Sequence, residues 1–354
     1  MPGEDMTEQR KAEHVDIILK EQVNAEYNYW NDVHLIHKAL PEVDHDSIDI
    51  SARLLGRELR APLVIASMTG GFPEARQINE NLAKAAAETG VALGVGSQRA
   101  ALENPALEDT YSVVKDYDIP LRFANIGAPQ LVEQEGKGAY GFLEAQEAMN
   151  MVKAQALLVH MNFLQEVVQP EGEKRAKGCL SAVQMLAARL PVVAKETGAG
   201  ISREMALSLK RAGVRGLDVG GLGGTSFSAV EYYRARKEGE SSKEKLGATF
   251  WNWGIPTPAS VVLARVGLPV IATGGVRTGL DVARAVCLGA SAAGIAKPML
   301  EAAKQSAEAV VKEINLIIDE LKAAMFLTGS ANLDELMGAQ CIVTRPTSDW
   351  MEVG

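Results

Sequence analysis

The sequence predicts a (β/α)8 TIM barrel, an α/β fold in which eight parallel strands alternate with helices. Between residues 61 and 298, eight short apolar runs end in small or polar residues, and helix-like stretches lie between them. Eight such units over about 240 residues match the usual size of this barrel, roughly 250 residues. A doubly wound open sheet is the alternative, but it rarely needs eight such evenly spaced units.

Each predicted strand changes from apolar to small or polar residues at its carboxyl end. In chain order the strands are PLVIASMTGG, VALGVGSQR, LRFANIGA, ALLVHMNF, PVVAKETG, GLDVGGLGG, PVIATGG and AAGIAKP. Helix-like segments such as EARQINENLAKAAAETG and SREMALSLKRAG separate them, and both of these close with a glycine in the C-cap role. In such barrels the chemistry lies at the carboxyl ends of the strands, so we expect the site there.

Two segments lie outside the repeating pattern. Residues 1–60 form a charged N-terminal extension, and residues 61–354 contain the barrel with a long amphipathic C-terminal helix that begins near residue 299. Residues 234–247, after the sixth strand, are rich in charge, glycine and serine. We interpret them either as a mobile loop or lid or as a solvated insertion.

Composition excludes several classes of function. The net charge of −9 and the pI near 5.3 argue against general nucleic-acid binding, which needs a broad basic surface. Cys179, Cys287 and Cys341 have no metal-ligand spacing, and they fit reduced thiols in a cytoplasm. The N-terminus lacks the apolar core of a secretory signal, and no apolar run is long enough to cross a membrane.

The last two strands end in TGGVR (273–277) and AGIAKP (293–298), which predict a phosphate site. Glycines let a backbone approach a ligand, successive N–H groups can hold an anion, and Arg277 could add charge. The alternative for each glycine pair is a tight turn. DVGGLGGTSF (218–227) contributes Thr225 to an open rim, or forms only a flexible turn, and Asn125 offers an amide that can bind a heterocycle edge.

Lys195 lies on the fifth strand and shares a face with Val193, so it projects inward if that face lines the barrel. A buried lysine is costly unless it is paired. It could form a Schiff base or place a cation beside an electron-rich cofactor ring. An ion pair with Glu196 is less favoured, because neighbours on a strand point apart.

Four polar residues gather near the end of the fourth strand: His160, Asn162, Gln165 and Glu166. A single histidine is more often a satisfied core residue. With a carboxylate close by, a hard-cation site becomes reasonable, since Mg²⁺ is usually held by one or two carboxylates plus substrate phosphates. The cysteines that zinc would need are absent from this segment. The N-terminal RKAEH (10–14) gathers two cations and a histidine, or forms only a solvated helix face.

These motifs together closely resemble the type 2 isopentenyl diphosphate isomerases, which use FMN. The matching pieces run in order from residue 10 to about residue 329: RKAEH, SMTGG, GVGSQRAALENP, ANIG, HMNFLQEVVQPEG, VAKETGAGIS, DVGGLGGTSF, NWGIPT, TGGVRTGLDVARAVCLGA and MFLTG. The HxNxxQExxxPEG element is highly specific. The departures are small: PEGD is PEGE here, with Glu173, GFG is GAG at 198–200, and Thr273 replaces a frequent serine.

The resemblance implies site residues by position. FMN contacts fall on Ser67, Met68, Thr69, Ser97, Asn125, Lys195, Thr225, Gly274, Gly275, Arg277 and Ala296. Diphosphate contacts fall on Arg10, Lys11, His14, Ser97, Gln98, Arg99, His160, Asn162 and Gln165, and the Mg²⁺ ligand falls on Glu166. No side chain is assigned as the catalytic acid or base.

The resemblance also implies the reaction, the movement of a double bond between isopentenyl and dimethylallyl diphosphate. Reduced FMN, supplied with electrons by NADPH or NADH, would serve as the acid–base group, and a cytoplasmic homo-oligomer, a tetramer or octamer, is expected. The main alternative is an FMN-dependent hydroxy-acid oxidase or dehydrogenase, which would need a histidine base near the flavin. A flavin-binding protein without activity would leave the polar set on the fourth strand unexplained.

Overall fold

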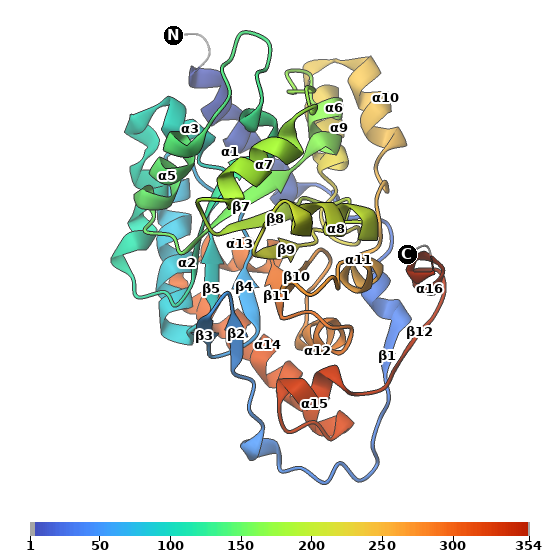
Figure 1. Ribbon diagram of the computed structural model, residues 1–354. Helices are drawn as coiled ribbons and strands as arrows, with labels where there is room; N and C mark the ends of the chain where they lie inside the picture. Colours follow the sequence, from blue (N-terminus) through green and yellow to red (C-terminus); the bar gives the residue numbers. More distant parts are fainter. Residues whose placement is uncertain (1–3, 353–354) are drawn as a thin grey trace.

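The computed structural model describes residues 4–352, and its centre is a closed barrel of eight parallel strands (Figure 1). The strands are β4 (Leu63–Ile65), β5 (Ala92–Gly94), β6 (Arg122–Gly127), β7 (Ala156–Met161), β8 (Val192–Glu196), β9 (Gly216–Asp218), β10 (Val270–Thr273) and β11 (Ala292–Ile295). The barrel closes where β11 pairs with β4, with Gly294 opposite Val64. The predicted fold class is confirmed, and the open sheet is excluded.

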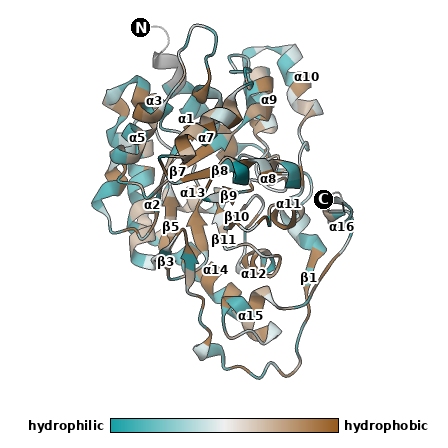
Figure 2. Cartoon of the chain, in the orientation of Figure 1, coloured by the Kyte–Doolittle hydropathy of each residue, from teal (hydrophilic) through white to brown (hydrophobic). Residues whose placement is uncertain are grey.

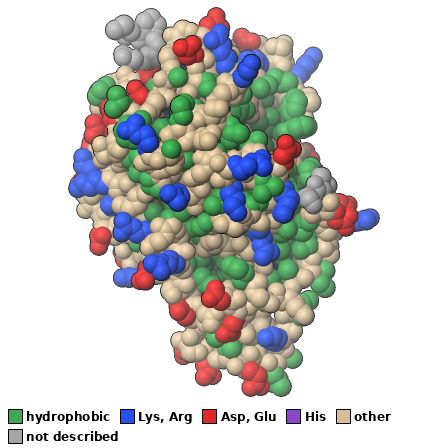
Figure 3. Space-filling view, viewed as in Figure 1, with side chains coloured by type: hydrophobic (Ala, Val, Ile, Leu, Met, Phe, Trp, Pro, Cys, Tyr) green, Lys and Arg blue, Asp and Glu red, His purple; other side chains and the backbone are tan. Residues whose placement is uncertain are grey.

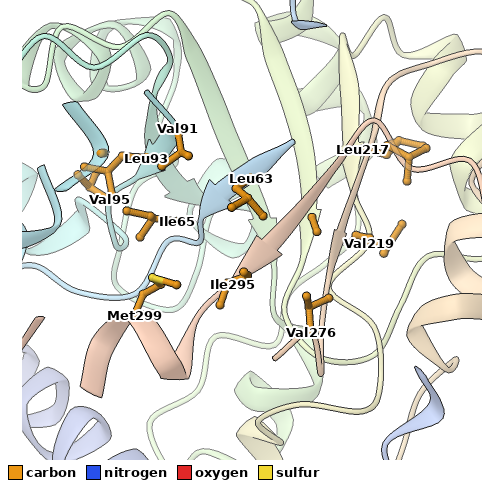
Figure 4. Packing of buried hydrophobic residues seen from close by; sticks show 14 of the residues in the cluster. Leu63, Ile65, Val91, Leu93, Val95, Leu217, Val219, Val276, Ile295 and Met299 are labelled. Atoms are coloured by element: carbon orange, nitrogen blue, oxygen red, sulfur yellow. The ribbon is translucent and has the colours of Figure 1, made fainter. Parts of the chain in front are cut away.

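Both faces of the strands are buried, which explains their short, continuous apolar runs. Val64, Phe123 and Leu158 belong to the cluster inside the barrel. The alternating residues, among them Leu63 and Leu93, pack outward in a second cluster shown in Figure 4. Apolar residues accordingly concentrate in the central strands in Figure 2, while the outer helices are more polar.

Helices cover the outside of the barrel. They include α2 (Ala75–Thr89), α5 (Phe142–Met151), α7 (Cys179–Ala187), α8 (Arg203–Arg211), α11 (Thr257–Leu263), α12 (Gly279–Cys287) and α14 (Ala307–Thr328). The two glycines predicted to end helices have positive φ, 71° at Gly90 and 88° at Gly213. The C-terminal helix is not continuous as predicted. It divides into α13 (Lys297–Ala303) and α14, because the Ser306 side chain caps the start of α14 by accepting a bond from the Ala309 N–H.

The N-terminal extension contributes to both ends of the barrel. The helix α1 (Glu4–Lys20) contacts α3 (Arg99–Glu103), α9 (Phe227–Glu238) and α13 beside the carboxyl ends of the strands. The hairpin of β2 (Ala52–Leu54) and β3 (Arg57–Leu59) closes the opposite end, where its leucines join the inner cluster. One end of the barrel is therefore sealed by apolar side chains, and the other is available for chemistry.

The C-terminal segment returns to the N-terminal extension. Strand β1 (Val33–Leu35), which follows the short helix η1 (Tyr29–Asp32), pairs antiparallel with β12 (Cys341–Val343). The helix α16 (Thr347–Met351) then packs on α11. The remaining described helices are η2 (His45–Ser47), η3 (Pro105–Leu107), α4 (Asp109–Ser112), η4 (Val113–Asp116), η5 (Ala128–Leu131), α6 (Phe163–Val168), α10 (Ser241–Thr249) and α15 (Leu333–Met337).

The segment 234–247 is largely helical, so its interpretation as a loop is wrong, whereas the alternative interpretation as a solvated insertion is not contradicted. Its first part completes α9, which ends at Gly239 with φ 77°, and most of the rest belongs to α10, which packs on α9. Charged residues suit an exposed helix face as well as a loop, so composition alone did not separate the two.

The molecular surface is mixed in charge. Acidic and basic side chains are interspersed over the face shown in Figure 3, without a broad basic area. Among residues 4–352, the structure has no helix that is both long enough and apolar enough to cross a membrane.

Candidate active site

A cavity of about 460 Å³ opens at the carboxyl ends of the strands, and α1 forms part of its wall. It falls within the roughly 300–1,000 Å³ typical of small-molecule sites. The predicted residues that line it are Arg10, Lys11, His14, Ser67, Met68, Thr69, Ser97, Arg99, Asn125, His160, Asn162, Gln165, Glu166, Lys195, Thr225, Gly274, Gly275, Arg277 and Ala296. Segments that are far apart in the chain thus meet in one place.

Gln98 is the exception among the predicted residues. Its side chain is fully buried away from the cavity: Nε2 donates to the Ala148 carbonyl at 2.8 Å, and Oε1 accepts from the Asn125 N–H at 2.9 Å. Gln98 directly precedes α3, and its side chain reaches α5 and β6 instead of capping α3. The structure therefore does not bring this side chain to the cavity wall; the side chain holds the backbone of Asn125 instead, and a contact of Gln98 with substrate stays a prediction.

The loop after β10 has the form of an anion site. Gly275 and Val276 line the cavity, and their backbone N–H groups have no protein acceptor within residues 4–352. The loop packs closely against the loop after β9, since a Cβ at Gly224 would lie 2.6 Å from the Gly275 nitrogen. Successive free N–H groups in such a turn bind anions, and Arg277 lines the same part of the cavity.

Two hydroxyl groups support a polar cofactor beside this loop. Ser67 Oγ and Thr273 Oγ1 are buried and have no partner in the described part of the chain, although both residues line the cavity. Buried hydroxyls without partners are costly, so a bound group with hydrogen-bonding edges would satisfy them. Together with the free N–H groups, they fit a phosphate-bearing heterocycle such as FMN.

Lys195 projects into the cavity as the strand alternation predicts. Its Nζ lies 3.2 Å from Asp218 Oδ2 and donates to the Glu196 carbonyl oxygen at 3.1 Å. The register of β8 and β9 places Lys195 beside Asp218, and both are buried. Asp218 was not predicted. A carboxylate in an otherwise apolar strand indicates that it pairs with a buried cation, here Lys195.

The Glu196 side chain points away from Lys195, as expected for neighbours on a strand. It accepts bonds from the N–H groups of Thr197, Gly198 and Ala199, at 2.5, 2.7 and 2.5 Å. Burial raises the pKa of Glu196 to about 7, although the hydrogen bonds from these three donors act to lower it. Its role in this structure is to hold the loop after β8, which borders the cavity through Thr197 and Gly198.

His160 is held by Asn125. Asn125 Nδ2 donates to the Val95 carbonyl, so its Oδ1 faces His160 Nδ1 at 2.8 Å, and Nδ1 carries the proton of the neutral ring. Burial, together with the positive charges of Lys195, Lys11 and Arg99, lowers the pKa of His160 to about 3. The imidazole is therefore neutral near pH 7, in a region of positive potential.

Lys11 fastens α1 to the barrel. Its Nζ contacts Tyr111 Oη at 2.5 Å, Ser97 O at 2.5 Å and Gly70 O at 3.1 Å, which uses all three N–H groups of an ammonium. Burial and the nearby cations Arg10 and Arg99 lower the pKa of Lys11 to about 7. Tyr111 was missed because nothing in its local sequence distinguishes it from a core tyrosine.

A buried ion-pair network joins α1 to α9. Glu231 Oε1 lies 2.9 Å from His14 Nε2 and accepts from Gln165 Nε2 at 2.9 Å, while its Oε2 lies 2.7 Å from Arg234. Burial alone would raise the pKa of Glu231, but His14, Arg234 and Gln165 hold it at about 2. Glu231 and Arg234 were not predicted, because their partners come from distant parts of the chain.

Glu166 lies on α6 and not on a loop. Its Oε1 accepts from Asn162 Nδ2 at 2.9 Å, and its Oε2 accepts from the Glu173 N–H at 2.7 Å. Asn162 Oδ1 is buried without a partner, so two kinds of hard oxygen atom lie together at the cavity. Residues 4–352 contain no group of three or more histidine, cysteine or acidic residues that would hold a metal alone. The donor set fits Mg²⁺ only when the ligand supplies further oxygens.

Glu173 balances the charge of Arg99. Its Oε1 lies 2.7 Å from Arg99 and 3.0 Å from Lys137, and its Oε2 accepts from Gln130 at 2.7 Å. The longer side chain at this position, where the resembling family has aspartate, therefore has a full set of partners. Arg99 remains at the cavity wall with a second partner, Glu103, at 2.8 Å.

Comparison with known proteins gives relatives of the whole chain and of its fold. A family model described as FMN-dependent dehydrogenase matches residues 180–343. The isopentenyl-diphosphate delta-isomerase of Thermoplasma volcanium is 49% identical over 98% of this chain and 100% of its own length, and that of Archaeoglobus fulgidus is 47% identical over 98% and 99%. A structure described as a lactate oxidase of Pediococcus acidilactici aligns with TM-score 0.64 and 14% identity over 96% of this chain and 94% of its own. A mandelate oxidase aligns with TM-score 0.60 and 19% identity over 94% and 92%.

Proposed function

Because the chain belongs to the isopentenyl-diphosphate delta-isomerase family, we propose that it interconverts isopentenyl and dimethylallyl diphosphate with reduced FMN and Mg²⁺. The observation that carries the proposal is a single cavity with two separate anion-binding regions. One is the free N–H loop at Gly275 and Val276, and the other is the cationic region around Arg10 and Arg99. An FMN phosphate and a substrate diphosphate would occupy one region each.

The diphosphate region is prepared for an anion. Arg10, Lys11 and Arg99 gather positive charge around a buried volume. Burial, together with nearby positive charge, lowers the pKa values of Lys11 and His160. Bringing a diphosphate here would relieve the repulsion and replace water with fixed donors. His14 and Gln165 are oriented for this contact by Glu231, which binds both of them.

Glu166 and Asn162 Oδ1 would hold Mg²⁺ together with oxygens supplied by the diphosphate. One carboxylate with substrate phosphates is a usual environment for this ion. Burial raises the pKa of Glu166 despite its bonds to Glu173 and Asn162. A cation would hold this carboxyl in its ionised form, so the metal and the charge at Glu166 support one another.

On this proposal the residues that would hold the FMN phosphate are Gly274, Gly275, Arg277 and Ala296. Those that would contact the rest of the cofactor are Ser67, Met68, Thr69, Ser97, Asn125, Lys195 and Thr225. When bound and reduced, FMN would supply a group that exchanges protons without net redox change. Lys195 would place positive charge beside the ring, held in position by Asp218. NADPH or NADH would be the reductant, and we infer no dedicated binding site for either.

An FMN-dependent hydroxy-acid oxidase or dehydrogenase is the second candidate function, because the family model and the structural neighbours are of that class. Those neighbours are below 20% identical and show the fold alone. The histidine that such a reaction would use as base has one candidate on the strands of this cavity, His160, which is hydrogen-bonded to Asn125. The observations therefore favour the isomerase.

Proton NMR separates the two functions. Isopentenyl diphosphate is incubated with the protein, FMN, Mg²⁺ and a catalytic amount of NADPH, and the spectrum is followed with time. The isomerase proposal expects signals of the two methyl groups of dimethylallyl diphosphate, with no steady consumption of NADPH. Continued consumption of NADPH or of a hydroxy acid without isomer formation would support the oxidoreductase instead.

A further inference from the structure

Two of the three cysteines meet where the C-terminal segment docks on the barrel. Cys287 is the last residue of α12, and Cys341 is the first residue of β12. The Cys287 thiol donates to the carbonyl oxygen of Ala339 at 3.3 Å, so it lies against the residues that lead into β12. The two thiols also interact directly. This interaction raises the pKa of Cys287 and lowers the pKa of Cys341 to about 7.

The two thiols differ in access. Cys287 is buried, whereas Cys341 is partly exposed. The thiolate is the nucleophilic form of cysteine, and thiol–disulfide exchange needs access to the attacking sulfur. Cys341 therefore has the properties of an attacking cysteine, and Cys287 has those of a resolving cysteine beside it. Cys179, the third cysteine, is buried elsewhere against the Ala128 carbonyl and has no cysteine neighbour in the described chain.

We propose that Cys287 and Cys341 form a reversible disulfide that fastens the C-terminal strand to α12. The Cys341 thiolate attacks one sulfur of a low-molecular-weight disulfide and releases one thiolate. Cys287 then loses its proton and attacks the Cys341 sulfur of the mixed disulfide, which releases the second thiolate. Two cysteine thiols are oxidised, and one small disulfide is reduced to two thiols. This disulfide takes no part in the isomerase reaction. All three thiols were expected to be reduced, and on this proposal two of them can be oxidised reversibly.

The location of this pair gives the disulfide a structural consequence. β12 pairs with β1, with Cys341 opposite Leu35, and β1 follows η1. In η1, Trp30 Nε1 donates to the Gly274 carbonyl oxygen at 2.9 Å, while α12 begins directly after the Gly274–Arg277 loop. The disulfide would therefore join α12, which follows this loop, covalently to β12, whose partner strand β1 follows the η1 helix that contacts the loop. Closing a chain loop in this way restricts the unfolded state and stabilises the fold.

The test uses the full-length protein with FMN bound. The reduced protein is incubated with oxidised glutathione at pH 8, quenched in acid, and digested without reductant for mass spectrometry. We expect a peptide pair joined through Cys287 and Cys341, with a loss of two of the three free thiols and a higher unfolding temperature. Dithiothreitol should restore three thiols and the original unfolding temperature.

Matched variants separate this bond from other oxidation. Cys179→Ser should still lose two thiols, whereas Cys287→Ser and Cys341→Ser should give no linked pair and no rise in unfolding temperature. The proposal is overturned if the wild-type protein retains three thiols, if Cys341 is found only as a glutathione adduct, or if Cys341 links two chains in a dimer on a non-reducing gel. These outcomes are read on the wild-type chain, so a variant that fails to fold does not affect them.

Discussion

Charge at single residues decides what the cavity can bind. Glu166 is the carboxylate that faces the diphosphate region from α6, and it shares hydrogen bonds with Asn162 and Glu173. Replacing one oxygen with an amide keeps the shape of the side chain but removes the charge that attracts a cation. On the proposed function, the effect of Mg²⁺ on activity should therefore depend on this side chain more than on any other named here.

We expect Glu166→Gln to lower kcat/KM by about 100-fold and to weaken the dependence on Mg²⁺, while FMN remains bound. Removing one preorganised electrostatic contact typically costs about 100- to 1,000-fold in rate. The measurements are initial rates across a Mg²⁺ titration and the visible spectrum of the purified variant. An unchanged Mg²⁺ response would show that the ion binds elsewhere.

Lys195 and Asp218 should act on the flavin in opposite directions. A cation beside the ring stabilises the negative charge of the reduced form, so Lys195→Ala should lower the reduction potential of FMN and slow isomerisation about 100-fold. Asp218 offsets part of that charge from 3.2 Å, so Asp218→Asn should raise the potential. Potentiometry of both variants in one buffer is the test. Equal potentials in wild type and Lys195→Ala would place the cation away from the ring.

Several residue positions could be predicted from alternation alone. His160 and Lys195 follow inward-facing apolar residues on their strands, and both face the cavity. Glu231 and Tyr111 could not be predicted, because their significance comes from partners more than sixty residues away in the chain. Gln98 was misplaced because it lies past the end of its strand, where alternation no longer determines direction.

At the scale of elements, the proposed binding regions depend on the backbone of the loop after β10 and on the docking of α1. The loop after β10 leaves the N–H groups of Gly275 and Val276 free, and it packs on the loop after β9 without space for side chains. A strand and its glycine motif could be recognised from the sequence. The backbone-to-backbone packing of the two loops could not be recognised from the sequence, because it depends on the register of β9 and β10.

Gly275→Val should reduce FMN affinity by at least about 10-fold, since the charge-assisted bonds lost at a phosphate are each worth about 1.5–3 kcal/mol. Gly275 has φ +72°, and a Cβ there would lie 2.6 Å from the Gly223 carbonyl oxygen. Gly136 has the same φ of +72° with nothing within 4 Å, so Gly136→Val isolates the backbone penalty. The two variants are compared by FMN titration of the apoprotein. Similar affinities would show that the loop does not hold the phosphate.

The docking of α1 should determine substrate affinity and leave the flavin unaffected. Deleting residues 1–14 removes three residues of the cavity wall, Arg10, Lys11 and His14, so KM for the diphosphate should rise while the flavin spectrum is retained. Arg10→Ala should raise KM about 10- to 100-fold, in line with charged hydrogen bonds of about 1.5–3 kcal/mol.

Lys20→Ala is the matched control for this helix. Lys20 is an exposed cation that pairs with Asp16 on α1. Exposed pairs of this kind contribute about 0–1 kcal/mol, so we expect a KM close to that of the wild type. A normal KM in both the truncated protein and Arg10→Ala would contradict the assignment of α1 to the substrate site.

The whole molecule combines a net negative charge with a local positive site. The formal charge is −9, yet Arg10, Lys11, Arg99 and Lys195 all line one cavity. The composition argued against a broad basic surface, and the barrel class followed from the spacing of eight strands. The concentration of cations beside α1 depends on the closed barrel. The barrel brings the ends of β5 and β8 to the same cavity, beside the N-terminal helix.

This arrangement predicts that diphosphate binding takes up protons. Burial and nearby cations lower the pKa of Lys11 to about 7, so much of it is neutral at pH 8 in the free protein. A bound diphosphate would add negative charge and raise that pKa, so Lys11 would gain a proton on binding. His160, with a pKa of about 3, would stay neutral at pH 8 even after a rise of several units. Uptake at pH 8 therefore reports on Lys11.

Titration calorimetry of isopentenyl diphosphate at pH 8, with FMN oxidised so that no turnover occurs, measures this uptake. The heat should depend on the ionisation enthalpy of the buffer, with a slope that corresponds to uptake of up to about one proton per site. Lys11→Met should bind more weakly and lose the buffer dependence, whereas Lys20→Ala should retain both the affinity and the slope. A heat that is the same in all buffers for the wild-type protein would mean that Lys11 is already charged in the free site, and that its three contacts to Tyr111, Ser97 and Gly70 outweigh the repulsion from Arg10 and Arg99.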